Sequence, residues 1–392
     1  MRRLAANYVF PVSSHPIKNG IIEVDDDGTI SQIIDPGAQF RELRKVEFYN
    51  GILVPGFVNC HCHLELSALK GYLKQNSGLP SFIQAIRKYR NRVPENELLR
   101  AIRDADREMY YNGIRISADI SNTDYSFETK AESKIHYYNF IEVFGLSAVN
   151  RKKNYRKALN LHKKLSEEFQ LKGNLTPHAP YSLASKLFRD IFSKPGSKKP
   201  LFSFHYRECS PKTEKRLRRR LKFSNLLKNF HFSVLWEDAF KNDYLSLFPG
   251  EDPCLLVHNT YAGMEDIKQA NDHFSNLYWI LCPNSNLFIE GKIPDINLFV
   301  ERSQRLAIGT DSLASNHKLS VLDELITLQK HFPDTSLEDL ILWATLNGAK
   351  ALKADQLAGS FEPGKRPGVN LLYDLDLPKW KLTENTKVKT IL

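Results

Sequence analysis

The sequence predicts an α/β protein, a (β/α)8 TIM barrel with a small β-sandwich domain formed by both termini. Two observations predict this fold. Strand-like apolar segments alternate with helix-like segments through the middle of the chain, and both ends carry short strands separated by turn residues. The length of 392 residues suits a barrel of roughly 250 residues or more together with an accessory unit.

Eight segments read as barrel strands because each is a short apolar run rich in β-branched and aromatic residues. They cover residues 52–59, 114–120, 137–144, 174–178, 201–205, 254–258, 278–282 and 306–310. Helical spacing of apolar residues falls between them, at residues 95–111, 155–169, 184–192, 264–274 and 321–331. A further helix is expected after Ser336, a residue type that is typical of helix N-caps.

The two ends of the chain resemble each other. Strand-like runs at residues 5–12, 21–24 and 30–34 are separated by turn residues such as Asn19-Gly20, and similar runs occupy residues 369–373 and 388–392. We therefore expect one composite β domain, formed by residues 1–50 and 360–392, beside a barrel spanning residues 51–359.

The composition is that of an ordinary globular protein, with 42% hydrophobic and 26% charged residues. No apolar run approaches the ~20 residues that cross a bilayer, and no secretory signal is recognised at the start. Five cysteines at scattered positions form no disulfide pattern. These features predict a cytoplasmic protein with reduced thiols and no membrane partner.

The net charge of +10 raises the possibility of nucleic-acid binding. Much of the excess lies in three runs, at residues 151–156, 198–199 and 212–222. Since no known nucleic-acid-binding module accompanies them, we interpret them as solvated surface and expect no nucleic-acid partner. A basic surface could still attract an anionic small molecule.

His61 and His63 close the first apolar run. Alternate residues of a strand share one face, so both imidazoles should point together while Cys60 and Cys62 point away. Such a pair suits a divalent metal ion, although two histidines in a surface loop would give the same pattern.

Further polar residues stand where later strands end, which is where barrel enzymes carry their chemistry. They are His178, His205, His258 and Asp311. Buried histidines and carboxylates are costly unless they are paired or ligated. Packing alone accounts poorly for so many of them, and a metal-dependent enzyme explains them together.

The motifs at these positions resemble the amidohydrolase superfamily, in its mononuclear metal-dependent deaminase branch. This branch is similar to adenosine, S-adenosylhomocysteine and aminodeoxyfutalosine deaminases, and is related to chlorohydrolases. The resemblance rests on residues 54–63 (VPGFVNCHCH), 178–182 (HAPYS), 205–208 (HYRE), 256–258 (LVH), 282–286 (CPNSN), 309–312 (GTDS), 349–352 (AKAL) and 359–370 (GSFEPGKRPGVN).

The resemblance implies a metal site. Its ligands would be His61, His63, His205 and Asp311, holding one divalent ion, with Zn2+ the first choice and Fe2+ or Mn2+ the alternatives. The fourth barrel strand ends in His178 and carries no lysine that could bridge a second ion, which favours one metal.

The resemblance also implies catalytic roles. Asp311 would accept a proton from water and His258 would orient the attacking hydroxide. Glu208 would carry protons to the ring nitrogen and to the departing ammonia. The alternative for Glu208 is a salt bridge with Arg207 or with a neighbouring lysine.

Four residues are predicted to contact or surround the substrate. His178 would bind it, with a purely structural histidine as the alternative. Glu65 would bind ribose hydroxyls or a ring nitrogen, or would instead pair with Lys70 or Arg87. Ser285 and Asn286 would shape the loop around the site.

The resulting hypothesis is a hydrolytic deaminase that releases ammonia from an aminated heterocycle. The expected substrate is a small molecule, an adenine-type nucleoside with aminodeoxyfutalosine as first choice. Alternatives are a guanine- or cytosine-like base, a triazine or a cyclic amide. A catalytically silent scaffold of the same fold is the alternative of another class, and the complete ligand set argues against it. Family resemblance makes a homodimer reasonable.

Overall fold

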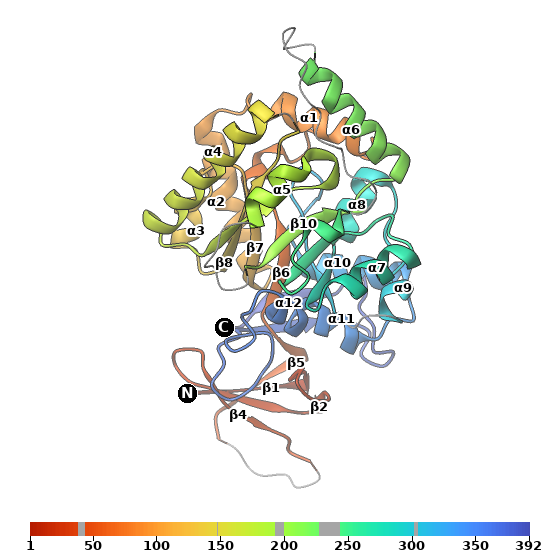
Figure 1. Cartoon of the computed structure of the whole chain (residues 1–392). Helices are drawn as coiled ribbons and strands as arrows, with labels where there is room; N and C mark the ends of the chain where they lie inside the picture. Colours follow the sequence, from red (N-terminus) through yellow and green to blue (C-terminus); the bar gives the residue numbers. More distant parts are fainter. Residues whose placement is uncertain (38–43, 147, 193–199, 227–243, 302–304) are drawn as a thin grey trace.

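The computed structural model describes residues 1–37, 44–146, 148–192, 200–226, 244–301 and 305–392. Figure 1 shows a large α/β unit, with helices outside and strands inside, above a β unit that holds both chain termini. No helix in the described ranges is both long enough and apolar enough to cross a membrane.

Eight parallel strands form the α/β unit, in two four-stranded sheets with the chain order preserved. The first sheet contains β6 (Phe57–Cys62), β7 (Ile114–Ser121), β8 (His136–Val143) and β9 (Gly173–Pro177). The second contains β10 (Phe202–Tyr206), β11 (Cys254–His258), β12 (Leu277–Leu281) and β13 (Leu306–Ile308). Seven of these strands were predicted from the sequence to within two residues at each end. The first was not, because the predicted run 52–59 covers the end of β5 (Val46–Pro55), a strand of the other sheet, and only the start of β6.

Backbone hydrogen bonds join the two sheets on both sides. The His205 N–H donates to the His178 carbonyl at 3.0 Å, which links β10 to the end of β9. The Thr310 N–H donates to the His61 carbonyl at 3.0 Å, and a parallel bridge pairs Cys62 with Asp311. The predicted (β/α)8 barrel is confirmed.

The helices cover the outside of the strands (Figure 1). They are α1 (Leu79–Tyr89), α2 (Glu95–Tyr111), α3 (Phe127–Glu132), α4 (Ala148–Glu167), α5 (Ser185–Phe192), α6 (Pro211–Leu226), α7 (Met264–His273), α8 (Pro283–Glu290), α9 (Asn297–Val300), α10 (Val321–His331), α11 (Leu337–Ala344) and α12 (Leu346–Ala351). Short 3-10 turns occupy Leu64–Leu69 (η1), Pro180–Ser182 (η2) and Leu245–Leu247 (η3). The prediction found α2 and α10 with their exact bounds and overlapped α4, α5, α7 and α11. It did not name α1, α3, α6, α8, α9 or α12.

Two of the basic runs lie on helices, α4 and α6. Lys152, Lys153, Lys212, Lys215 and Arg216 are exposed, as expected of solvated helix faces. Lys198 and Lys199 lie outside the described residues.

The β unit is one seven-stranded sheet built from both ends of the chain. Its strands are β1 (Arg2–Val9), β2 (Ile17–Lys18), β3 (Ile21–Val24), β4 (Ile30–Ile34), β5 (Val46–Pro55), β14 (Val369–Tyr373) and β15 (Lys387–Thr390). Their order is β15-β14-β5-β1-β3-β4, with β2 paired to β1. The predicted domain bounds stay a proposal, with residues 1–50 and 360–392 in one domain and 51–359 in the other. The predicted sandwich form of the smaller domain also stays a proposal.

Gly56 carries the chain from this sheet into the barrel. A Cβ atom at Gly56 would lie 2.3 Å from Arg115 Cγ and 2.4 Å from the Pro367 carbonyl oxygen. The crossing is therefore too crowded for any side chain. Because β6 begins at the next residue, this close passage fixes where the first barrel strand starts and hence where its histidines lie.

The predicted N-cap of α11 is confirmed, since the Ser336 side chain accepts a hydrogen bond from the Asp339 N–H at 3.0 Å. Ser336→Ala removes this acceptor and should lower the free energy of unfolding by about 1 kcal/mol. Urea denaturation followed by circular dichroism measures the change. Ser166→Ala, the same substitution at an exposed position within α4, is the control and should have no such cost. Equal effects of the two variants would contradict the capping role.

Candidate metal centre and active site

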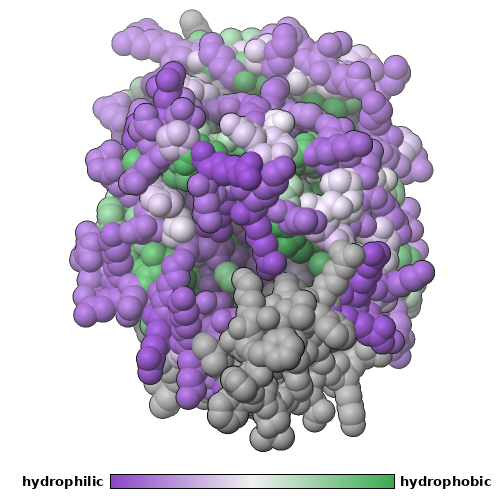
Figure 2. Space-filling view, turned by 90° about the horizontal axis from the view of Figure 1, so that it is seen from above, coloured by the Kyte–Doolittle hydropathy of each residue, from purple (hydrophilic) through white to green (hydrophobic). Residues whose placement is uncertain are grey.

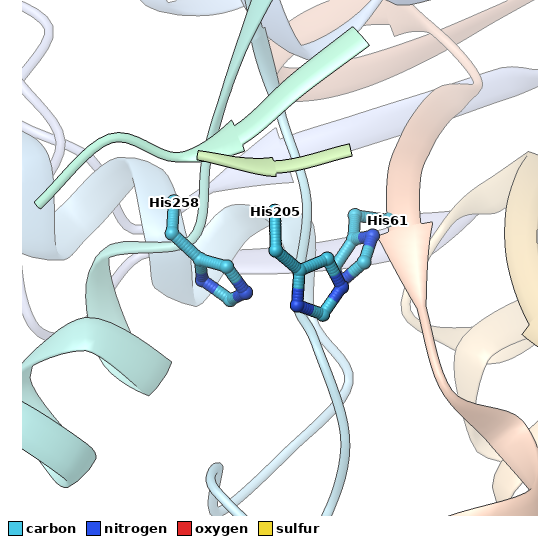
Figure 3. Close-up of side chains that lie close together, drawn as sticks. All are labelled: His61, His205 and His258. Carbon is cyan, nitrogen blue, oxygen red and sulfur yellow. The ribbon is translucent and has the colours of Figure 1, made fainter. Parts of the chain in front are cut away.

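The polar residues predicted at strand ends lie together at one end of the barrel. The imidazole centroid of His61 lies 4.9 Å from that of His63, 5.0 Å from that of His205 and 5.4 Å from that of His258. Figure 3 shows His61, His205 and His258, which come from three different strands, with their rings close together. His63 Nε2 lies 3.7 Å from Asp311 Oδ1. The convergence expected from the sequence is therefore present.

Strand geometry alone does not produce this arrangement. The register of β10 and β11 pairs His205 with Val257, so regular alternation would point His258 to the opposite face. His258 instead has φ +74°, a left-handed backbone that turns its ring beside that of His205. Asp311 has φ +56° where β13 ends. Non-glycine residues rarely adopt this conformation, and such strain gathers at functional sites.

The first strand is also irregular. The pairing of β6 with β7 shifts between Asn59 and Cys62, and Cys60 and Cys62 belong to different apolar clusters. The expectation that both cysteines share one face, opposite to the histidines, is therefore wrong. Their role as packing residues fits the structure, because both thiols are buried and burial raises the pKa of each.

The donors fit a metal ion. Both ring nitrogens of His61 and of His205, and Nε2 of His258, are buried without a hydrogen-bond partner among the described residues. Burial, followed by the neighbouring histidines, holds the pKa of His61 and of His205 well below the usual range. Neutral imidazoles with free lone pairs are what a divalent cation binds.

Among the described residues, three overlapping groups of three have ligand atoms within 4.8 Å of one another. They are His61, His63 and Asp311; His61, His205 and His258; and Glu142, His178 and His205. His258 thus lies as near to the cluster as a ligand would. The geometry brings the four imidazoles and the Asp311 carboxylate together. The ligand set His61, His63, His205 and Asp311 stays a prediction.

Glu208 stands beside the cluster. Its side chain is 9% exposed, with Oε2 at 3.6 Å from His205 Nδ1 and Oε1 at 3.9 Å from His258 Nε2. The Tyr181 hydroxyl donates to Oε2 at 3.0 Å. The alternative ion pair with Arg207 is not formed, because that guanidinium binds Asp266 at 2.5 Å.

Ser285 and Asn286 lie on helix α8, so the expectation that they belong to a loop is wrong. Pro283 stands at the start of α8, where its fixed φ suits a first helical residue. Ser285 Oγ donates to Asp311 Oδ2 at 2.6 Å. Asn286 accepts at Oδ1 from His258 Nδ1 at 3.0 Å and donates to the His258 carbonyl at 3.1 Å. Both residues orient members of the cluster.

His178 and Glu65 occupy different surroundings. The His178 ring lies 4.8 Å from that of His205, so it borders the cluster. Glu65 pairs with Arg90 at 2.5 Å rather than with Lys70 or Arg87. Its other oxygen accepts from the backbone N–H groups of Asn122 and Thr123 at 3.1 and 2.9 Å and from the Thr123 hydroxyl at 2.6 Å. Its carboxylate is thus already occupied.

The sequence reasoning missed two features of the site. Glu142, near the end of β8, lies 3.7 Å from His205 Nε2. Its spacing of two from the core residue Phe140 was the available signal, since both must share a face. Ser315, which donates to Asp311 Oδ2 at 2.8 Å, gave no signal because serine is common in turns.

A buried ion pair supports the segment after His63. Lys130 of α3 and Asp119 of β7 have fully buried side chains in direct contact. Asp119 Oδ1 accepts from the Leu64 N–H at 2.7 Å, next to His63. Lys130 also donates to Ser121 and Asn139, both at 2.8 Å. The pair therefore fixes the backbone from which His63 projects.

Hydrophilic residues dominate the face seen from above in Figure 2, which is the end of the barrel where the strands terminate.

The chain and its fold are similar to known proteins. The Amidohydrolase family profile matches residues 52–391. An adenosine deaminase of Helicobacter pylori is 28% identical over 358 residues, covering 90% of this chain and 84% of that protein. An aminodeoxyfutalosine deaminase of Nitratiruptor is 28% identical over 339 residues, covering 84% of this chain and 80% of that protein. The crystal structure of Helicobacter pylori aminofutalosine deaminase with methylthio-coformycin superposes with a TM-score of 0.79 at 26% identity, covering 97% and 94%.

Lys130→Met leaves the Asp119 charge buried without its partner and should lower the free energy of unfolding by about 3–5 kcal/mol. Thermal or urea unfolding measures the loss. Adding Asp119→Asn to this variant removes the buried charge and should restore part of the lost free energy of unfolding. Lys172→Met, at an exposed lysine, is the control and should change little. A Lys130→Met variant as stable as the control would refute the supporting role.

Glu324 of α10 holds the segments that carry Ser285 and Ser315, and it should make stability depend on pH. It accepts from the Asn284 N–H and the Asn316 amide at 2.8 and 2.7 Å, and burial raises the pKa of Glu324 to about 8. Because the unfolded chain releases this proton at lower pH, Glu324 costs stability progressively as pH rises from about 4.5 to about 8, and by a constant amount above that.

Between pH 4.5 and 8, the unfolding free energy of the unaltered protein should therefore fall relative to that of Glu324→Gln. The shift should disfavour the native protein at high pH by on the order of 5 kcal/mol. Chemical denaturation at a series of pH values measures the difference. Glu168→Gln, at an exposed glutamate, should show no such trend. A difference that stays flat between pH 4.5 and 8 would count against the raised pKa.

Proposed function

The chain belongs to the amidohydrolase family and its relatives include deaminases, which hydrolyse carbon–nitrogen bonds; from this we propose that it is a metal-dependent deaminase of adenine-type nucleosides. Aminodeoxyfutalosine is the first-choice substrate. The reaction replaces the amino group of the ring carbon with oxygen from water and releases ammonia.

One observation carries the proposal. A carboxylate that can carry protons, Glu208, lies within 4 Å of two imidazoles of a buried cluster suited to a metal ion. Hydrolytic deamination needs an activated water and a group that gives protons to the ring and to the leaving nitrogen. A scaffold protein has no need for unpartnered buried imidazoles, which are costly.

The metal would be held by His61, His63, His205 and Asp311, and we propose zinc because nitrogen ligands with one carboxylate suit its tetrahedral preference. A bound divalent cation supplies Lewis acidity that lowers the pKa of water toward neutrality. Asp311 is prepared to use one oxygen, because Ser285 and Ser315 already donate to Oδ2 and leave Oδ1 facing His63.

Glu208 acts on the substrate's nitrogens. Tyr181 holds Oε2, and burial keeps that phenol protonated by raising its pKa. Glu208 takes one proton from the attacking water and gives it to the ring nitrogen as the carbon–oxygen bond forms. Asp311 takes the second proton of that water as the carbonyl forms, and this proton passes through Glu208 to the amino group. The carbon–nitrogen bond then breaks, ammonia leaves, and both carboxylates end as they began.

His258 orients the water. Asn286 donates its amide hydrogen to the His258 carbonyl, so its Oδ1 must accept from Nδ1 of the ring. The proton of a neutral His258 is therefore on Nδ1, and Nε2 faces Glu208 as an acceptor at 3.9 Å. This acceptor can take a hydrogen bond from the attacking water and hold it toward the substrate.

The adenine-type substrate is favoured by the two relatives named above, one an adenosine deaminase and the other an aminodeoxyfutalosine deaminase. Methylthio-coformycin is the ligand of the similar solved structure. All five cysteines are free and buried, which supports our proposal that the enzyme works in the reducing cytoplasm. A homodimer stays a prediction.

Glu208→Gln removes the proton carrier and should lower turnover by about 10²–10⁴-fold while the zinc content stays unchanged. The assay is ammonia release by the zinc-loaded protein over adenine nucleosides, aminated purines and pyrimidines, and triazines. Metal analysis of the same preparations gives the zinc content. Glu265→Gln, at an exposed position of α7, is the matched control with normal turnover.

Loss of zinc in Glu208→Gln would show that Glu208 serves the metal site instead. Ammonia release confined to triazines or free bases would overturn the nucleoside proposal, and its absence from every compound would overturn deamination.

A further inference from the structure

We propose that Glu142 and His178 together bind two neighbouring hydroxyl groups on the sugar of the substrate. This inference rests on the proposed function. It assigns substrate recognition to a carboxylate that neither the metal cluster nor the proton transfers use.

Glu142 faces the interior of the barrel. It is two residues beyond Phe140, which packs in an apolar cluster with Ile120 of the neighbouring strand. The register of β8 and β9 pairs Glu142 with Thr176, and His178 follows two residues later on the same face. The two side chains therefore come from adjacent strands and lie beside His205 of the next one.

The charge of Glu142 has no cationic lysine or arginine beside it among the described ion pairs. Its side chain is 3% exposed. Its Oε1 lies 3.9 Å from His178 Nε2 and 3.7 Å from His205 Nε2. The Asn122 amide donates to Oε2 at 2.9 Å. One oxygen is thus anchored, and the other faces the two imidazoles.

His178 presents a second acceptor at the same place. Ser182 Oγ lies 2.8 Å from His178 Nδ1 and donates its own hydrogen to the Ala179 carbonyl at 3.0 Å. It can therefore only accept from the ring, so a neutral His178 carries its proton on Nδ1. Nε2 is left as an acceptor that faces Glu142 Oε1.

Two acceptors 3.9 Å apart with no donor between them call for a ligand that brings donors. A pair of neighbouring hydroxyls supplies two O–H groups, one for the carboxylate and one for the imidazole. A second cation is less suitable, although these atoms and His205 lie within 4.8 Å of one another. His205 is already required by the catalytic cluster.

Glu65 positions this carboxylate. It accepts from the backbone N–H of Asn122, and the Asn122 side chain then donates to Glu142. Arg90 balances the charge of Glu65 at 2.5 Å. The predicted contact of Glu65 with ribose is therefore replaced, in this proposal, by an indirect role through Asn122.

The test compares adenosine with 2′,3′-dideoxyadenosine, which lacks both hydroxyls. The zinc-loaded protein should deaminate adenosine with a kcat/KM at least about tenfold higher, since a site built for hydroxyls rejects ligands that lack them. Glu142→Gln should lower kcat/KM for adenosine by about 10- to 100-fold, mainly through KM, and should change it for the dideoxy compound by less than about threefold. The kcat/KM of Glu142→Asp for adenosine should lie between that of the unaltered protein and that of Glu142→Gln.

Glu128→Gln, at an exposed position of α3, is the matched control and should keep the preference of the unaltered protein. Zinc content is measured for every variant. Equal treatment of the two nucleosides by the unaltered protein would overturn the proposal even if no variant folds. An equal loss on both nucleosides in Glu142→Gln, or a loss of bound zinc, would also overturn it.

Calorimetric binding of both nucleosides to Glu208→Gln separates this inference from the proposed function. Tighter binding of adenosine without any ammonia release by the unaltered protein would support the hydroxyl contact and refute deamination. Ammonia release with equal binding of both nucleosides would refute the contact and keep deamination.

Discussion

The structure depends on a cluster of imidazoles that are held neutral, buried and unpartnered at one end of a barrel. His61 and His205 have no hydrogen-bond partner at either ring nitrogen among the described residues. Buried polar atoms of this kind cost free energy unless something satisfies them. Because their low pKa values keep them uncharged, a cation is the partner that can satisfy several of them at once. Fold stability and metal binding are therefore coupled at this point.

Around this cluster, each polar neighbour restricts one atom and leaves another available. Two serine hydroxyls hold Asp311 Oδ2 and leave Oδ1 facing His63. Asn286 fixes the His258 ring, and Tyr181 holds one oxygen of Glu208. Such partners set the orientation and basicity of the groups that bind and react, so the chemistry is prepared before a ligand arrives.

The sequence predicted the strands and the convergence of their polar ends, because apolar periodicity and the rule of strand-end active sites are local or general. It could not predict how His258 reaches the cluster. Regular alternation points that ring away, and only the left-handed backbone at His258 turns it inward. The shifted register at Cys60 and the helix at Ser285 were missed for a related reason. Each is a departure from regular geometry that tertiary packing imposes.

Glu65 and Glu142 show that hydrogen-bond partners decide whether a buried carboxylate is available to a ligand. Glu65 was singled out by its place after the histidine pair, yet Arg90 and the Asn122–Thr123 segment occupy both of its oxygens. Glu142 stands in an unremarkable strand, yet its Oε1 has only two imidazole nitrogens beside it, those of His178 and His205 at 3.9 and 3.7 Å. The Asn122 amide satisfies Oε2 of Glu142 but no hydrogen bond among the described residues satisfies Oε1, and a buried oxygen in that state has more to gain from a ligand that brings hydroxyl groups. Availability of a buried atom, rather than proximity to a motif, therefore identifies the residue that recognises the substrate.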